Sequence, residues 1–175
     1  MKDIRLKSSK NKYFNQAIEL YKRSFPLIER RELKELLRVL KLPQFHFNAL
    51  LESGEFVGTA IFWEADDFIY FEYLCVLETK RNNGLGSDAL LDLANRNKPV
   101  IFEIEKPTDE ISSRRIKHYQ KLGFVLGDIE HTQVKYRQDD DEFKMFIMTY
   151  KKPVTAVLYQ KFRKFLDDVV APKFK

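Results

Sequence analysis

One junction constrains the fold of this chain more than any other feature. The run DFIYFEYLCVLE, residues 67–78, is almost continuously apolar, as expected of a strand that is covered on both faces of a sheet. The run KRNNGLGS, residues 80–87, follows it and contains two glycines and a basic pair. A strand therefore passes through a flexible turn into a segment whose apolar residues recur at helical spacing, namely Leu85, Ala89, Leu90, Leu93 and Ala94.

Such a turn has the properties of an anion site. The first backbone N–H groups of a helix have no partner within the helix, the helix dipole favours negative charge there, and glycine lets the backbone approach a ligand closely. Lys80 and Arg81 add full positive charge. The spacing fits neither a P-loop, which needs Lys-Ser or Lys-Thr after its glycines, nor a dinucleotide fingerprint with a third glycine. The alternative, that the glycines serve only the geometry of the connection, stays open at this point.

The rest of the chain predicts a mixed α/β fold in one domain, residues 1–175, with helices on both faces of the sheet. Period-2 and nearly continuous apolar runs predict the strands, and apolar residues at helical spacing predict the helices. The final strands are expected to form a hairpin across the acidic loop at 139–142. In chain order the expected elements are a strand at 3–7, helices at 13–25 and from 33 to before Pro43, strands at 44–53, 55–65 and 67–78, a helix from 85, a strand at 98–105, a helix at 110–122, strands at 131–138 and 142–150, and a helix at 154–170.

Composition and charge exclude several function classes. The longest strongly apolar stretches are too short to cross a bilayer and the start has no apolar signal core, so a cytoplasmic protein without membrane contact is expected. Residues 51–150 carry 12 basic and 19 acidic residues, a net charge of −7, which argues against a continuous nucleic-acid face. No metal site is predicted, because none of the three histidines has ligand spacing with acidic residues or the one cysteine.

Two motifs resemble one known family. The run LCVLETKRNNGLGSDALL resembles the acetyl-CoA motif R/Q-x-x-G-x-G/A of the GNAT superfamily of N-acetyltransferases, with Arg81, Gly84 and Gly86 at its fixed positions. About thirty residues further on, IKHYQKLGF resembles the family segment F-Y-x-K-L-G-F, with His118 in place of the usual aromatic residue. The resemblance covers about residues 3–150. It implies a mostly antiparallel sheet that is splayed between strands four and five, and it leaves the helix at 154–170 outside the usual fold.

The resemblance implies that acetyl-CoA is the co-substrate. The pyrophosphate would lie on backbone N–H groups of the glycine turn, and the pantetheine arm would pair with main chain near the end of the fourth strand, where one N–H would polarise the thioester carbonyl. Ser112 falls near a position where many members carry an asparagine that contacts the cofactor. The expected cofactor-binding residues are Leu74, Cys75, Val76, Arg81, Asn82, Asn83, Gly84, Leu85, Gly86, Ser87 and Ser112.

The resemblance also implies catalytic roles. Tyr119 matches the tyrosine that commonly protonates the departing thiolate. Glu72 is the candidate base, and strand alternation places it on one face with Tyr70, Leu74 and Val76. A role for Glu72 in an ion pair, Glu103 or Glu105 as the base, and transfer without a strong base stay open as alternatives. Cys75 is interpreted as a small buried side chain, and the transfer as direct.

The predicted function is therefore N-acetylation of a primary amine, on a small cationic molecule or on a peptide or protein, by a monomer or homodimer. The central negative charge favours a cationic acceptor. The alternative is a coenzyme A-binding regulatory or interaction module that has lost turnover. The acidic residues expected to line or rim the acceptor cleft are Glu29, Asp66, Asp67, Glu72, Glu103 and those of the 139–142 loop.

Overall fold

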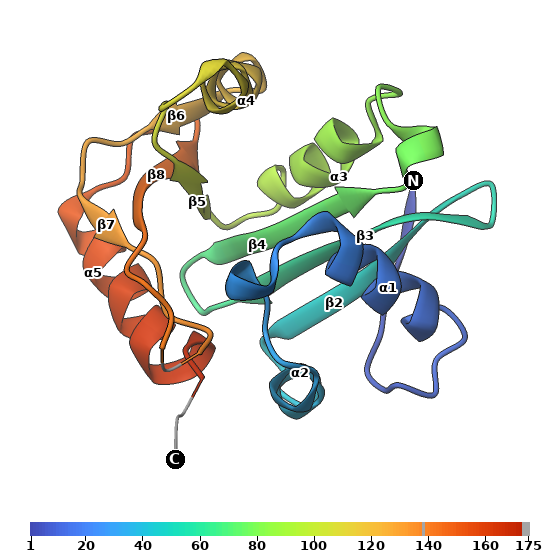
Figure 1. Ribbon diagram of the computed structural model, residues 1–175. Coiled ribbons are helices and arrows are strands. Elements are labelled where there is room, and N and C mark those ends of the chain that lie inside the picture. The colour runs from blue at the N-terminus through green and yellow to red at the C-terminus, as the bar shows by residue number, and fades with distance from the viewer. Residues whose placement is uncertain (138, 173–175) are drawn as a thin grey trace.

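The computed structural model describes residues 1–137 and 139–172 and contains one mixed sheet (Figure 1). The strands follow the order β1-β2-β3-β4-β5-β8-β6, and β7 also pairs with β8. Each pairing is antiparallel except that of β4 with β5. The strand bounds are β1 (Lys2–Arg5), β2 (Phe45–Glu52), β3 (Glu55–Glu64), β4 (Ile69–Val76), β5 (Val100–Glu105), β6 (Phe124–Leu126), β7 (His131–Thr132) and β8 (Lys144–Tyr150).

Helices cover both faces of this sheet, which confirms the predicted architecture. One apolar cluster joins β2, β3 and β4 to α1, α2 and α5, and a second joins β4, β5 and β8 to α3 and α4. No helix in the described parts of the chain is long and apolar enough to cross a membrane. The helix bounds are α1 (Phe14–Ser24), α2 (Leu33–Val39), α3 (Leu85–Ala94), α4 (Glu110–Lys121) and α5 (Ala156–Phe165), with 3₁₀ turns at Leu27–Glu29 and Glu78–Lys80 and a π-helical turn at Leu166–Val170.

The sheet is splayed between β4 and β5. These strands pair only where Ile69 and Tyr70 lie opposite Val100 and Ile101. Beyond that point the two strands diverge, and β5 continues with β8 in the other half of the sheet (Figure 1). The splay that the resemblance implied is therefore present. It leaves the second half of β4 without a partner strand on its β5 side.

A β-bulge in β4 corrects one prediction. Between Phe71 and Tyr73, β4 has one residue more than β3, and that residue is Glu72. A bulge shifts the alternation of the side chains that follow it. Leu74 and Val76 therefore pack toward α3, whereas Glu72 bonds to side chains of the cluster on the α1 side. The expectation that Glu72 shares a face with Leu74 and Val76 is wrong.

The last hairpin is also shorter than predicted. Its first strand ends at Thr132, and the chain then forms an irregular loop that buries Tyr136. The backbone N–H groups of Tyr136 and Arg137 donate to the Asp140 carboxylate at 3.1 and 2.8 Å, so this turn replaces ladder hydrogen bonds. Residue 138, the expected end of that strand, lies outside the described residues. The short strand β6 was not predicted from the sequence.

Candidate active site

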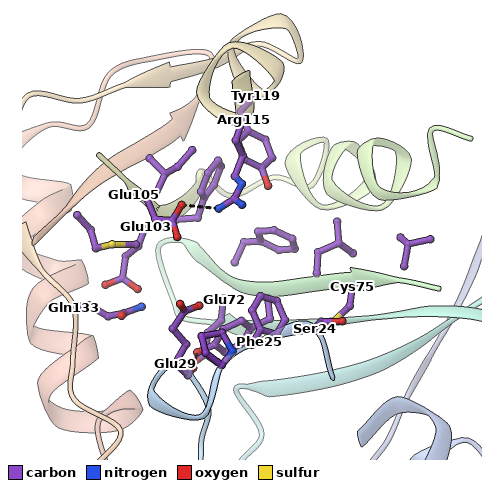
Figure 2. A pocket seen from close by; sticks show the side chains of 18 of the residues that line it. Ser24, Phe25, Glu29, Glu72, Cys75, Glu103, Glu105, Arg115, Tyr119 and Gln133 are labelled. Atoms are coloured by element: carbon purple, nitrogen blue, oxygen red, sulfur yellow. Dashed lines mark hydrogen bonds and ion pairs between the residues drawn. The ribbon is translucent and has the colours of Figure 1, made fainter. Parts of the chain in front are cut away.

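The splay contains a cavity of about 470 Å³ (Figure 2). One wall is the second half of β4, which pairs with β3 on one side and has no partner strand on the side toward β5. The opposite wall comes from β5 and from α4, and the segment that links α1 to α2 closes one end. The side chains that the chemistry can use are Glu29, Cys75, Glu103, Glu105, Arg115 and Tyr119.

A second cavity of about 640 Å³ lies over the glycine turn. It shares Leu74, Val76, Arg81, Arg115 and Tyr119 with the first, so the two form one continuous groove from the turn into the splay. Such a groove suits an elongated ligand with an anionic end at the helix N-terminus.

The two glycines of the turn have different roles. Gly84 immediately precedes α3 with φ of +79°, a left-handed conformation that side chains disfavour. Gly86 lies in the first turn of α3, where a Cβ atom would lie 3.3 Å from the Leu74 side chain and 3.8 Å from that of Val76. Gly84 therefore sets the path of the backbone, and Gly86 permits close packing of α3 on β4. The N–H groups of the first helical turn are left free to face the groove.

Most of the predicted cofactor-binding residues line this groove, and two do not. Asn83 turns away, and its amide donates to the Lys80 carbonyl at 3.5 Å. Ser112 is buried in the first turn of α4, where its hydroxyl accepts from the Asp109 backbone N–H at 3.1 Å in a capping box and donates to the Asp109 carboxylate at 2.7 Å. Its hydroxyl is therefore already used. The predicted residues that do line the groove are Leu74, Cys75, Val76, Arg81, Asn82, Gly84, Leu85, Gly86 and Ser87.

Tyr119 lies where the two cavities meet. Its ring packs edge-on against Phe102, with centroids 4.9 Å apart, and its hydroxyl points into the groove (Figure 2). No hydrogen-bond partner within the described part of the chain occupies that hydroxyl. Burial raises the pKa of Tyr119, and the charge of Arg115 opposes the rise only in part. The phenol therefore keeps its proton at neutral pH and can donate it to a group in the groove.

Glu72, the predicted base, is engaged in a buried network. Its side chain is 1% exposed, and its carboxylate accepts hydrogen bonds from Arg31 at 2.9 Å, Trp63 at 2.8 Å and Tyr136 at 2.5 Å. Arg31 balances the negative charge of Glu72, and most lone pairs of the Glu72 carboxylate already accept hydrogen bonds. This geometry favours the ion pair over the role of a base.

Arg31 extends this network to the C-terminal helix. It donates to the carbonyl of Val170 at 2.7 Å, and its guanidinium lies 5.2 Å from the Trp63 ring and 4.9 Å from the Tyr136 ring. The network therefore joins the α1–α2 link, β3, β4 and the segment after α5. Sequence reasoning did not single out Arg31, and its only local signal was the charged run ERRE.

Three other carboxylates line the cavity. Glu105 pairs with Arg115 at 2.8 Å. Glu29 has no ion-pair partner among the described residues, and its pKa is raised by burial and then by the nearby charge of Glu105. Glu103 is almost fully buried and contacts Tyr70 and His131. The end of the cavity away from the glycine turn is therefore acidic.

Two predicted cleft residues lie elsewhere. Asp67 pairs with Lys161 of α5 at 2.5 Å, and Asp66 lines the same shallow surface depression beside that helix. Asp140, in the acidic loop, is used to cap the turn after β7. The prediction that Asp66 and Asp67 rim the acceptor cleft is wrong, because the β3–β4 turn that carries them faces α5.

The sequence comparisons now decide the family. Residues 14–124 match the sequence profile described as "Acetyltransferase (GNAT) family". The chain belongs to this family. A curated relative, "Putative acetyltransferase YjbC" of Bacillus subtilis (strain 168), is 37% identical over 67 residues, which are 37% of this chain and 34% of that protein. The match therefore spans about a third of that relative's length.

Solved GNAT structures share the fold. A structure titled "Putative acetyltransferase from GNAT family from Bacteroides thetaiotaomicron" is 28% identical, covers 99% of this chain and 100% of its own, and superposes with a TM-score of 0.90. The yncA structure from Salmonella typhimurium, solved with its cofactor acetyl-CoA, is 20% identical, with 89% and 96% coverage and a TM-score of 0.54. The predicted family and fold are confirmed.

Cys75 in this GNAT protein is unsuited to covalent catalysis. Burial raises the pKa of its thiol to about 12, so the nucleophilic thiolate is scarce at neutral pH. The residue lines the cavity as a small apolar side chain, which is consistent with direct transfer. Across residues 1–137 and 139–172, no group of three or more His, Cys, Asp or Glu side chains is arranged to hold a metal ion.

Replacing Gly84 with valine should abolish the rise in melting temperature that acetyl-CoA produces in this GNAT protein. A ligand at about 100 times its dissociation constant stabilises a protein by roughly 2.7 kcal/mol. A β-branched residue is strained at this positive φ and would displace the N–H groups from the ligand. Gly54→Val is the matched control, because Gly54 also has positive φ and open space around it, in the remote β2–β3 turn. An unchanged thermal shift in Gly84→Val would mean that the turn is only structural.

Proposed function

We propose that this protein transfers the acetyl group of acetyl-CoA to the primary amine of a cationic acceptor by direct attack. One observation carries the proposal: a single groove begins at the free N–H groups of the α3 N-terminus and ends among the carboxylates of Glu29, Glu103 and Glu105. An anionic donor fits the first end and a cationic acceptor fits the second.

The unpaired half of β4 supplies the donor's main-chain contacts. Because the pairing with β5 ends at Tyr70, the backbone N–H and C=O groups of Leu74, Cys75 and Val76 on that side have no partner strand. The amides of a pantetheine arm can pair with them as an added strand would. One of these N–H groups would then stabilise the oxyanion that develops on the thioester.

The proton balance defines the catalytic groups that are needed. An ammonium acceptor loses one proton before its nitrogen attacks the thioester carbon, and the C–N bond forms. The tetrahedral intermediate then loses a second N–H proton and collapses, and the C–S bond breaks. Tyr119 donates its hydroxyl proton to the thiolate and is reprotonated. In sum, coenzyme A takes up one proton and the other leaves to solvent. The site therefore needs a path that carries this other proton from the amine to solvent.

The acceptor amine panel is the test of this function. Polyamines, aminoglycosides, amino acids and peptides with free N-termini should be incubated with acetyl-CoA while release of free thiol is followed. Faster release with cationic amines than with amino acids of equal concentration supports the proposal. A thermal shift with acetyl-CoA but no release above hydrolysis with any amine would instead indicate the alternative, a coenzyme A-binding module without turnover.

Replacing Glu29 with glutamine should raise KM for a cationic amine about tenfold while kcat changes little. Glu29 is the cavity carboxylate that has no ion-pair partner among residues 1–137 and 139–172, and a partly desolvated charge pair of this kind contributes about 1–2 kcal/mol. Steady-state kinetics with the best amine of the panel measure the effect. The control is Glu32→Gln, because Glu32 lies three residues further along the chain, outside the cavity. Equal KM values for both variants would remove Glu29 from the acceptor site.

A further inference from the structure

A chain of hydrogen bonds leads from the cavity wall to the C-terminal helix. Glu103 lines the cavity from β5, and its carboxylate lies 2.5 Å from His131 Nε2. The other ring nitrogen, Nδ1, lies 3.1 Å from the Tyr159 hydroxyl of α5. The side chains of His131 and Glu103 are 0% and 4% exposed, whereas Tyr159 is only half-buried. The chain therefore joins a site inside the protein to a residue at its surface.

The positions of the protons follow from the partners. The Tyr159 hydroxyl donates its only proton to the carbonyl of Glu130 at 3.2 Å, so it must accept from Nδ1–H of His131. Tyr70 donates to the second carboxylate oxygen of Glu103 at 2.6 Å. Two lone pairs cannot face each other at 2.5 Å, so one proton is shared between His131 Nε2 and Glu103. That proton lies on the short contact and can move toward either group.

The surroundings leave this pair as the available acceptor. The titratable or charged groups that interact with Glu103 from neighbouring elements, besides His131, are Tyr70 of β4, Tyr136 after β7, and Tyr159 and Arg163 of α5. Glu72 is neutralised by Arg31 and already accepts three hydrogen bonds. Glu105 is held by Arg115. Glu103 alone among the cavity carboxylates is linked to the surface through groups that both accept and donate a proton.

We propose, resting on the acetyl transfer proposed above, that Glu103, His131 and Tyr159 form the relay that takes the acceptor's proton to solvent. The N–H proton passes to the Glu103 carboxylate as the shared proton moves onto His131 Nε2. The Nδ1 proton moves to the Tyr159 oxygen, and the Tyr159 proton leaves to water. Once the product has left, Glu103 gives its added proton to water in the cavity and His131 Nδ1 regains a proton from solvent through Tyr159. Each group thereby returns to its starting protonation, and one proton in total leaves per turnover. Glu103 is thus the base, and His131 and Tyr159 are positioning and relay residues.

The relay gives the C-terminal helix a part in the chemistry. The resemblance places this helix outside the usual fold, and the structure packs its Phe162 against the rings of His131 and Tyr70, at 5.7 and 5.1 Å. Arg163 holds the helix to β7 through the carbonyl of Thr132 at 2.7 Å. These contacts fix the distance between Tyr159 and His131, which a relay requires.

The test compares Glu103→Gln and Tyr159→Phe with wild-type protein, using the amine of the panel that wild-type protein acetylates fastest. Glu103→Gln should lower kcat about a hundred-fold or more at neutral pH. Tyr159→Phe, which keeps the ring and removes only the hydroxyl, should lower it about tenfold. Both deficits should shrink as rising pH deprotonates the free amine, and KM for acetyl-CoA should stay unchanged. The control Tyr13→Phe removes a hydroxyl from a half-buried ring outside the groove and should behave as wild type.

The outcomes separate the relay from the function on which it rests. Wild-type turnover with wild-type-like pH profiles in both variants would overturn the relay and leave the acetyltransferase standing. A deficit that persists unchanged at high pH would show that the chain is structural and would also overturn it. No acetylation of any amine by wild-type protein would overturn the proposed function, and the relay with it.

Discussion

Tyr119→Phe should lower kcat about a hundred- to ten-thousand-fold while the affinity for acetyl-CoA stays nearly constant. The phenol donates its proton only as the C–S bond breaks, so its loss affects the transition state and not the bound cofactor. Phenylalanine preserves the packing on Phe102 and Phe124. Because burial raises the pKa of Tyr119, wild-type protein keeps the donor protonated through the neutral and mildly alkaline range. Single-turnover kinetics together with acetyl-CoA titration measure the two quantities separately.

The matched control for this variant is Tyr150→Phe. Tyr150 packs against Phe124 in the same apolar cluster, with centroids 5.1 Å apart, but it lines neither cavity. We expect Tyr150→Phe to retain wild-type turnover. Wild-type-like turnover in Tyr119→Phe would remove the acid assignment and leave the ring with a packing role.

Glu72→Gln should lower the free energy of unfolding by about 3–5 kcal/mol, because it leaves Arg31 buried without its counter-charge. The side chains of Arg31 and Glu72 are each 1% exposed, so water cannot replace the lost interaction. The loss should also loosen the contact between Arg31 and Val170 that holds the end of the C-terminal helix. Chemical denaturation measures this change in the free energy of unfolding. The same m-value, the slope of that free energy against denaturant concentration, is used for all variants.

Glu64→Gln provides the comparison for Glu72→Gln. Glu64 pairs with Lys98 at 3.1 Å, but its side chain is 36% exposed, so its replacement should cost no more than about 1 kcal/mol. The opposite pattern would restore the earlier prediction of Glu72 as the base: stability close to wild type in Glu72→Gln, with a rate deficit at neutral pH that disappears as the amine deprotonates. A loss of stability and rate together, at all pH values, supports the structural role.

The parts of the fold and site that the sequence predicted are those with local signals. Each such signal determines only the structure of the residues next to it. Examples are the apolar run of β4, the left-handed Gly84 before α3, and Gly123 after α4, which has φ of +93°. The groove-lining glycine turn and Tyr119 therefore followed from two short motifs. The helix after Pro153 followed from its own periodicity.

The parts that the sequence did not predict depend on residues far apart in the chain. Arg31 meets Glu72 across 41 positions and Val170 across 139, and His131 meets Glu103 across 28. Strand alternation could not reveal the bulge at Glu72, because the bulge is one extra residue in β4 between two positions that pair with adjacent residues of β3. A charge in an apolar strand signalled only that a partner was needed; the fold supplied an arginine for Glu72 and a histidine for Glu103.

Transfer of isotope-labelled acetyl from acetyl-CoA to an amine tests the central claim most directly. Wild-type protein, Gly84→Val and Gly54→Val should each be incubated with labelled acetyl-CoA and the panel of cationic amines, and the products analysed by mass spectrometry. The account predicts a labelled amide with wild-type protein and Gly54→Val, and none above the uncatalysed background with Gly84→Val. Labelled acetate as the sole product, with coenzyme A released and every amine unmodified, would contradict it.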